Sequence, residues 1–178
     1  VDCSDKMYLN RDPRFYSTIY YDGVKVKLEN GEYGVETYVG GNCGLSLSPS
    51  SRRNTCTGYY LRKFSNAQSS TSGGNKDGYI RMYRLAELYL NFAEAAYRAY
   101  GNADQQAPAT DVEETVTDDE DNETTSSVTY GVAMSARDAV NAVRARVGMP
   151  GVTDHGDAFW LRLCNERRVE LAFEEHRF

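Results

Sequence analysis

The segment at residues 80–100 (IRMYRLAELYLNFAEAAYRAY) constrains the fold most strongly, because its apolar residues cover most of the surface of one predicted helix. Its polar residues fall in one narrow stripe, which we expect to face solvent: Arg84, Glu87, Asn91, Glu94 and Arg98. The apolar arc spans more than half of the circumference, and one neighbouring helix cannot bury so wide a face. We therefore expect this helix to pack between at least two others, as helices do in helical-repeat proteins.

Two further segments predict helices that supply those neighbours. At residues 135–147, Ser135 followed by Asp138 predicts a capping box, and Gly148 with Pro150 marks the end of the helix. A third helix is predicted at residues 157–174. The sequence thus predicts a mainly α protein whose three helices pack side by side.

The third predicted helix carries charged residues among apolar ones. Glutamates recur every fourth residue beside arginines, so some of these charges must be buried and need partners. A pair of glycosidase carboxylates must flank its substrate from different elements, which one helix cannot provide. We expect Arg167 to pair with Glu170 and Arg177 with Glu174. The predicted network is structural and comprises Glu166, Arg167, Glu170, Glu174 and Arg177.

The first third of the chain has the alternation and the turn residues of β-structure. Residues 14–21 and 24–28 are predicted strands, joined by Asp22-Gly23 as a tight hairpin turn. Residues 57–64 predict another strand, and residues 40–54 and 65–78 are loops by composition. In the second strand, three apolar residues should face the core and two lysines should face water: Val24, Val26 and Leu28 against Lys25 and Lys27.

An acidic run (DVEETVTDDEDNET) lies between the first two predicted helices, within residues 103–130. It is too polar to bury, so we expect a mobile insertion. A calcium-binding loop is not supported, since Thr124 occupies the position that needs glycine and Tyr130 the position that needs glutamate.

Composition excludes several classes of function. The formal charge is −6, and the sequence has no basic region of the kind that binds nucleic acid. No apolar stretch reaches the length of a membrane span. The four cysteines have no zinc-binding spacing; Cys43 and Cys56 flank a loop and either form a disulfide or remain thiols. No motif of a known catalytic class occurs, so we expect no enzyme activity, no cofactor and no metal.

Four segments in the same order resemble the C-terminal part of the SusD/RagB family: NRDPRFYSTIYYDG, IRMYRLAELYLNFAEAAYRAY, AVNAVRARVGMP and NERRVELAFEEHRF. The family signature ER-x-x-E-L-A-F-E-x-x-R is matched from Glu166 to Arg177, and in the family it is structural. The resemblance implies a SusD-like helical scaffold with tetratricopeptide-type helix packing, plus β-hairpins and long loops in the first third. It also implies that residues 1–178 form one C-terminal region, a fragment that is hairpin- and loop-rich over 1–78 and helical over 79–178.

Members of this family are lipid-anchored outer-membrane proteins that hold oligosaccharides or polysaccharides at the cell surface for a SusC-like TonB-dependent transporter. The resemblance therefore implies non-catalytic glycan binding, with membrane contact only through a lipid anchor that this fragment lacks. A helical-repeat module that binds peptides or a protein partner remains the alternative.

A ligand surface on this chain should lie in its first third, because loops on a rigid scaffold can vary without disturbing the core. We predict Tyr33 and Tyr38 as stacking platforms for sugar rings, with Asn42 and Arg52 as hydrogen-bond donors to sugar hydroxyls. The alternative is that these are ordinary loop residues and that the main platform lies upstream.

Overall fold

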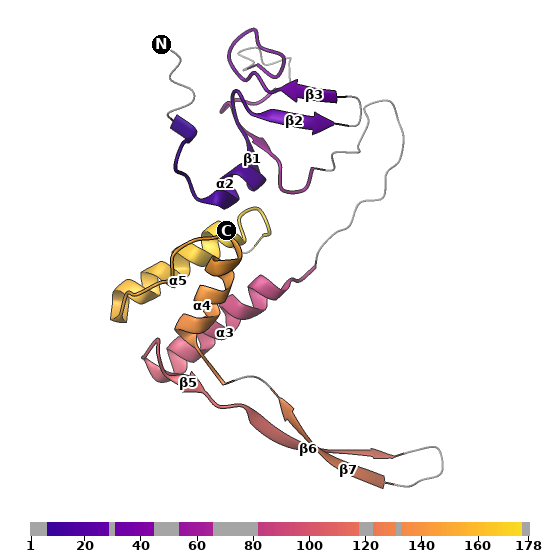
Figure 1. Ribbon diagram of the computed structural model, residues 1–178, viewed down its shortest axis with the longest axis vertical. Helices are drawn as coiled ribbons and strands as arrows, with labels where there is room; N and C mark the ends of the chain where they lie inside the picture. The colour runs from indigo at the N-terminus through magenta and orange to yellow at the C-terminus, as the bar shows by residue number, and fades with distance from the viewer. Residues whose placement is uncertain are drawn as a thin grey trace. The chain divides into compact units, whose positions relative to one another are not determined.

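The computed structural model describes residues 7–28, 31–44, 54–65, 82–117, 123–130 and 133–175. Its contacts divide the chain into two compact units, Val1–Met82 and Tyr83–Phe178. Both are drawn in Figure 1, and each is described by itself. The division falls close to residues 78–79, where the sequence changes from turn-rich to helical.

The first unit begins with a short helix where the sequence pattern predicted a strand. Helix α2 spans Pro13–Thr18 and begins with a proline, whose fixed φ suits the first helical turn. Asp12 caps it, because its Oδ1 accepts a hydrogen bond from the Arg14 amide at 3.0 Å. The strand predicted over residues 14–21 is therefore wrong except for its end, where β1 (Ile19–Tyr20) is extended. The Asp-Pro start signal outweighs the β-propensity of the aromatic residues that follow.

A two-stranded antiparallel hairpin follows. Strand β2 (Lys25–Leu28) pairs with β3 (Gly31–Gly34), and Val26 lies opposite Tyr33. The side chains of β2 and the residue before it alternate as predicted, with two half-buried valines and two exposed lysines: Val24 and Val26 against Lys25 and Lys27. The side chain of Leu28 lies outside the described residues.

The turn at Asp22-Gly23 does not join two paired strands, which corrects the hairpin predicted across it. Gly23 has a φ of 81° and donates its amide hydrogen to the Val35 carbonyl at 2.8 Å, so the turn pairs with the end of the following hairpin. Strand β1 pairs instead with β4 (Tyr60–Leu61). Of the strand predicted at residues 57–64, only β4 is extended.

Aromatic rings form the interior of the first unit. The rings of Tyr8 and Tyr21 have centroids 4.3 Å apart, and Phe15 stacks on Tyr21 at 5.4 Å. Tyr8 is buried; burial, together with the neighbouring Tyr59, raises the pKa of its phenol to about 12. Several of the tyrosines in the first third are thus committed to packing.

Within its described residues, the second unit contains three helices that lie side by side, which confirms the predicted helical packing (Figure 1). They are α3 (Leu85–Tyr100), α4 (Ala136–Arg146) and α5 (Gly156–Glu170). Helix α3 starts later than predicted, and residues 80–81 lie outside the described residues. Helix α5 ends four residues before the predicted end, where residues 171–175 form turns.

The core of this unit lies between the three helices. Leu90, Val140 and Phe159 are fully buried, and four alanines allow close approach of the helices: Ala93, Ala96, Ala136 and Ala139. Burial of each large side chain contributes about 1.5 to 3 kcal/mol. Tyr89 and Phe92 pack against this core, whereas Leu85, which belongs to the predicted apolar arc, is 64% exposed.

Helix α4 has the ends that the sequence predicted. The Ser135 hydroxyl accepts a hydrogen bond from the Asp138 amide at 3.1 Å, and the Ser135 amide donates to the Asp138 carboxylate at 3.1 Å, so the capping box is complete. Gly148 then takes a φ of 71°, a left-handed conformation that glycine adopts without steric cost.

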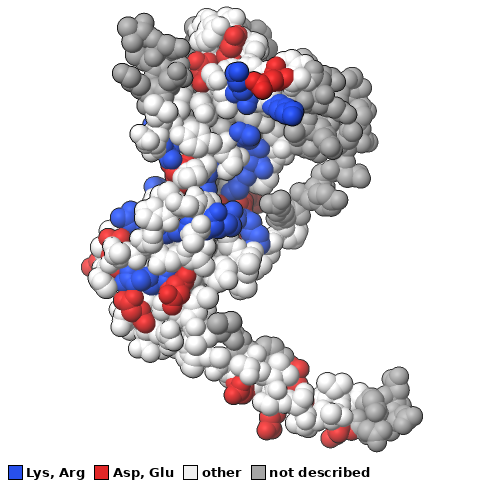
Figure 2. Space-filling view, viewed as in Figure 1, with Lys and Arg blue, Asp and Glu red and all other residues white. Residues whose placement is uncertain are grey.

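The acidic segment, which composition predicted to be a mobile insertion, forms a β-hairpin. Strand β6 (Thr110–Thr117) pairs with β7 (Glu123–Tyr130), and Val112 lies opposite Val128. The short strands β5 (Gln106–Ala107) and β8 (Met134–Ser135) pair at its base. The β-branched Thr and Val residues of both strands favour an extended backbone, and acidic side chains occur along the ribbon (Figure 2). The mobility of the segment stays a prediction.

Candidate functional site

Residues 31–44, here called the tyrosine loop, carry three of the four predicted ligand-binding residues. After β3 the backbone folds back on itself, and the amide of Cys43 donates to the carbonyl of Glu36 at 3.0 Å. The amide of Gly41 donates to the carbonyl of Tyr38 at 3.0 Å. These backbone bonds give a short loop a defined shape, which is the first requirement for a preorganised binding surface.

Two glycines allow the tyrosine loop to close so tightly. A Cβ atom on Gly41 would lie 2.5 Å from the carbonyl oxygen of Glu36, and one on Gly44 would lie 2.4 Å from that of Tyr38. Both distances are far below van der Waals contact, so any other residue at either position requires the backbone to shift. The shape of the loop therefore depends on glycine at these two positions.

Tyr33 and Tyr38 present their rings to solvent. Tyr33 lies on β3 and is 48% exposed, and Tyr38 lies in the turn that follows and is 54% exposed. The negative charge of Glu36 raises the pKa of the Tyr38 phenol above its ordinary value. Tyr38 thus remains a neutral hydroxyl that can both donate and accept hydrogen bonds.

The side chain of Asn42 binds its own loop, and its predicted role as a hydrogen-bond donor to sugar hydroxyls stays a prediction. Its Nδ2 donates to the Gly34 carbonyl at 2.8 Å, and its Oδ1 accepts from the Glu36 amide at 3.0 Å. Asn42 therefore supports the arrangement of the tyrosine loop. The fourth predicted residue, Arg52, lies outside the described residues.

Glu36 is a candidate that sequence reasoning missed. Its side chain is exposed, and its Oε2 lies 3.4 Å from the Asn42 amide that donates to it. A carboxylate beside two tyrosine rings can accept hydrogen bonds from sugar hydroxyls. The available signal was its position between Tyr33 and Tyr38, the two predicted stacking residues.

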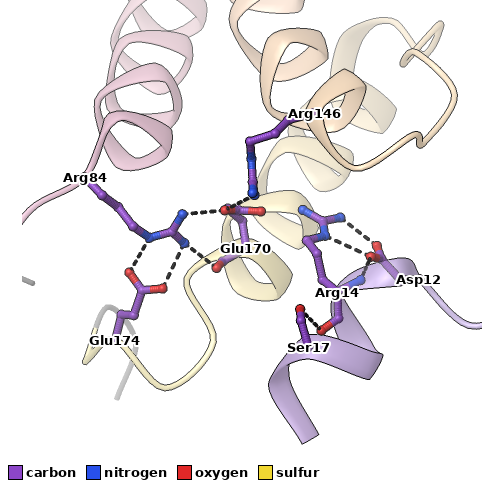
Figure 3. Close-up of polar contacts among 7 residues, drawn as sticks. All are labelled: Asp12, Arg14, Ser17, Arg84, Arg146, Glu170 and Glu174. Atoms are coloured by element: carbon purple, nitrogen blue, oxygen red, sulfur yellow. Dashed lines mark hydrogen bonds and ion pairs between the residues drawn. The ribbon is translucent and has the colours of Figure 1, made fainter. Parts of the chain in front are cut away.

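The second unit holds the predicted charge network, at the end of α5 (Figure 3). Arg84, at the start of α3, donates from Nε and Nη2 to both carboxylate oxygens of Glu174, at 2.7 and 2.8 Å. It also pairs with the Glu170 carboxylate and donates to the Glu170 carbonyl. Burial lowers the pKa of Arg84, but hydrogen bonds to Glu174 and Glu170 outweigh that effect and leave the pKa above its ordinary value.

Glu170 is shared between two arginines from different helices. Its side chain is 2% exposed, and its Oε1 accepts from Arg146 Nη2 at 2.7 Å as well as from Arg84. In the first unit, Arg14 pairs with the Asp12 carboxylate at 2.6 Å, which Figure 3 also shows. The predicted solvated stripe on α3 is thus partly wrong, since Arg84 serves this network and Glu87 is buried.

Glu166 is paired with a residue that the sequence did not single out. It is 1% exposed and its Oε2 accepts from Arg144 Nη1 at 2.7 Å, while Arg144 Nε donates to the Pro150 carbonyl at 2.7 Å. Arg144 belongs to α4, so this contact joins α4 to α5 through the core.

The pairing predicted for Arg167 is corrected by these contacts. Arg167 donates to Asn91 at 2.6 Å and lies 3.9 Å from the Glu94 carboxylate, both on α3, instead of pairing with Glu170. Glu94 also pairs at 4.0 Å with Arg98, four residues further along α3. Arg177, the predicted partner of Glu174, lies outside the described residues.

A small hollow of about 210 Å³ lies between α3 and α5, lined by Glu94, Arg98, Trp160, Leu163, Cys164 and Arg167. Trp160 stacks on Tyr97 at 5.9 Å, and the Arg98 guanidinium lies 4.4 Å from its ring centroid. Tyr97 and Arg98 pack against the ring of Trp160, so this ring is not available to stack on a sugar.

The described residues provide no group of three or more His, Cys, Asp or Glu side chains suited to a metal ion. Nor does any helix within these ranges combine the length and hydrophobicity that a membrane crossing requires. What remains as a candidate site is the tyrosine loop, with exposed rings held by a defined backbone.

Comparison with known proteins identifies the family. No curated protein matches the chain. Among solved structures, a SusD-like protein from Bacteroides fragilis superposes with a TM-score of 0.67 and 27% sequence identity, over 98% of this chain and 28% of that one. The chain therefore spans about 28% of the length of this relative. Because the SusD family model also matches residues 4–178, nearly the whole sequence, the chain belongs to the SusD family.

Proposed function

We propose that this chain is part of a non-catalytic protein that binds oligosaccharides at the bacterial cell surface and delivers them to a SusC-like TonB-dependent transporter. Membership of the SusD family carries the proposal, because its members are generally glycan-binding, non-catalytic surface proteins associated with the outer membrane. Attachment by a lipid anchor is part of the same proposal.

The tyrosine loop is the local feature that supports glycan binding. Aromatic faces stack on the apolar faces of sugar rings, and Tyr33 and Tyr38 expose such faces on a loop whose shape is set by Gly41 and Asn42. A rigid loop loses little conformational entropy when a ligand binds. We assign Tyr33 and Tyr38 as stacking residues and Glu36 as a hydrogen-bond acceptor.

The first test is retention of the protein in native gels cast with starch, xylan, pectin, mannan or chondroitin sulfate, followed by calorimetry with an oligosaccharide of the retained polymer. Tyr33→Ala with Tyr38→Ala should weaken affinity about tenfold or more, since each stacked ring contributes about 1 kcal/mol beyond area burial. The melting temperature should stay unchanged, because both rings are exposed.

Tyr83→Ala with Tyr100→Ala is the matched control, since these tyrosines are similarly exposed but lie in the second unit. This variant should bind the glycan as the unmodified protein does. Equal affinity for all three proteins would move the site away from the tyrosine loop. Absence of retention on every polysaccharide would count against glycan binding itself.

Peptide or protein binding is the second candidate, and the apolar surface of α3 favours it. Leu85 and Leu88 are 64% and 52% exposed on one side of this helix. If the helices pack in the tetratricopeptide manner, as we propose, such a face can line a groove for a peptide helix or strand. Binding to a random peptide pool in place of polysaccharide would support this alternative.

A further inference from the structure

The tyrosine loop and the segment before β4 are held together by the hydroxyl of Tyr60. This hydroxyl donates to the Cys43 carbonyl at 2.9 Å and accepts from the Thr55 amide at 3.2 Å. Thr55 directly precedes Cys56, so one phenol fixes the backbone beside both cysteines. Residues 45–53, which connect the two segments, lie outside the described residues.

A second contact shows that the two segments run close together. A Cβ atom placed on Gly58 would lie 3.5 Å from the Thr37 hydroxyl, an ordinary van der Waals distance. Cys43 is itself positioned by its amide, which donates to the Glu36 carbonyl. The fold thus brings the cysteine-bearing segments together at two separate points.

From this geometry we propose that Cys43 and Cys56 are a disulfide-forming pair. A disulfide needs two Cα atoms within about 7 Å. The Tyr60 hydroxyl is hydrogen-bonded to both the Cys43 carbonyl and the Thr55 amide, so these two backbone groups lie close together. The structure holds both as free thiols, with Cys56 exposed and Cys43 half-buried. The pairing is independent of which ligand the protein binds.

The chemistry is thiol–disulfide exchange with a disulfide-bearing oxidant. The exposed Cys56 thiolate attacks one sulfur of the oxidant, forms a mixed disulfide and releases one thiolate. The Cys43 thiolate then attacks the Cys56 sulfur and releases the second thiolate. The two cysteine protons go to the two departing thiolates, so the protein loses two electrons and the oxidant gains them.

Formation of this bond would tie the tyrosine loop covalently to the segment that leads into β4. A cross-link of this kind restricts the unfolded chain, so the oxidised protein should melt at a higher temperature than the reduced one. The exposed rings of Tyr33 and Tyr38 would then be carried by a loop that is closed by a covalent bond as well as by hydrogen bonds.

The test is an equilibrium with glutathione and glutathione disulfide, in a Cys3→Ser, Cys164→Ser background that leaves only the proposed pair. After acid quenching and alkylation, peptide mapping without reduction should find one peptide that joins Cys43 to Cys56 within a monomer. The effective concentration of the pair should be at least about tenfold higher in the native protein than in the same protein in about 8 M urea, because the fold holds the segments together.

Two variants sharpen the result. Tyr60→Phe removes the shared hydroxyl and should lower the native effective concentration about fivefold, whereas Tyr20→Phe, which changes another phenol of the same unit, should not. An effective concentration no higher in the native protein than in urea would overturn the proposal. Separate glutathione adducts on both cysteines, without a cross-link, would overturn it as well.

Discussion

Glu166 is 1% exposed, and the Arg144 guanidinium lies 2.7 Å from its carboxylate. A charge in the protein interior is costly unless it is paired, and removing one member of a buried pair typically costs 3 to 5 kcal/mol. Arg144→Ala should therefore lower the free energy of unfolding by about 3 kcal/mol or more. Urea denaturation followed by circular dichroism measures this difference.

Arg146→Ala is the matched control on the same helix. Arg146 is 57% exposed, and its partner Glu170 is also bound by Arg84, so the loss should be about 1 kcal/mol or less. Arg167→Ala should likewise cost little, since its contacts are partly exposed. Equal losses for Arg144→Ala and Arg146→Ala would show that burial does not set the strength of these pairs.

At the residue level, the sequence predicts that charges among apolar residues need partners, but it does not identify those partners. Spacing rules reveal only neighbours three or four residues apart on one helix, such as Glu94 and Arg98. Arg84 and Glu170 are 86 residues apart. Their contact depends on how α3 and α5 pack, which no local pattern contains.

The tyrosine loop is the element whose shape depends most directly on single residues. A Cβ atom on Gly41 would lie 2.5 Å from a backbone oxygen, whereas one on Gly34 would meet nothing within 4 Å. Gly41→Ala should therefore destabilise the protein by about 1 to 3 kcal/mol, as overpacking does, and Gly34→Ala by about 0.5 kcal/mol or less. Denaturation curves of the two variants give both values.

Hydrogen exchange locates the effect of Gly41→Ala. The amides of Gly41, Cys43 and Gly44 donate within the loop, so they should exchange faster in this variant, while the α4 amides should keep their protection. Unchanged exchange in the loop would mean that it accommodates a Cβ without opening.

Among the elements, the sequence predicted best where local signals were complete. The capping box at Ser135 defines the start of α4 because it depends on residues three apart. The strand predicted at residues 14–21 failed because a two-residue start signal, Asp12-Pro13, overrides the β-propensity of four aromatic residues. For the acidic hairpin, composition predicted a mobile insertion, although the β-branched residues Val112, Thr115 and Val116 suit paired strands.

For the whole molecule, the helical packing follows from the apolar pattern of α3, whereas the ligand surface does not follow from any motif. Tyr33 and Tyr38 were selected by residue type and loop position, and their exposure agrees with that selection without testing it. The apolar surface of α3 is only partly buried, because Leu85 and Leu88 remain exposed. The chain spans about 28% of the length of its SusD-like relative.

The two proposed functions place the binding surface in different units. The double variant Leu85→Ser with Leu88→Ser distinguishes between the two functions. Both side chains are more than half exposed, so the double variant should change the free energy of unfolding by about 1 kcal/mol or less in total. If glycan binding is the function, retention on polysaccharide gels should be the same for this variant and the unmodified protein, while Tyr33→Ala with Tyr38→Ala reduces it. If α3 is instead a peptide groove, the leucine variant should lose peptide binding because its apolar anchors are gone, and the tyrosine variant should keep it.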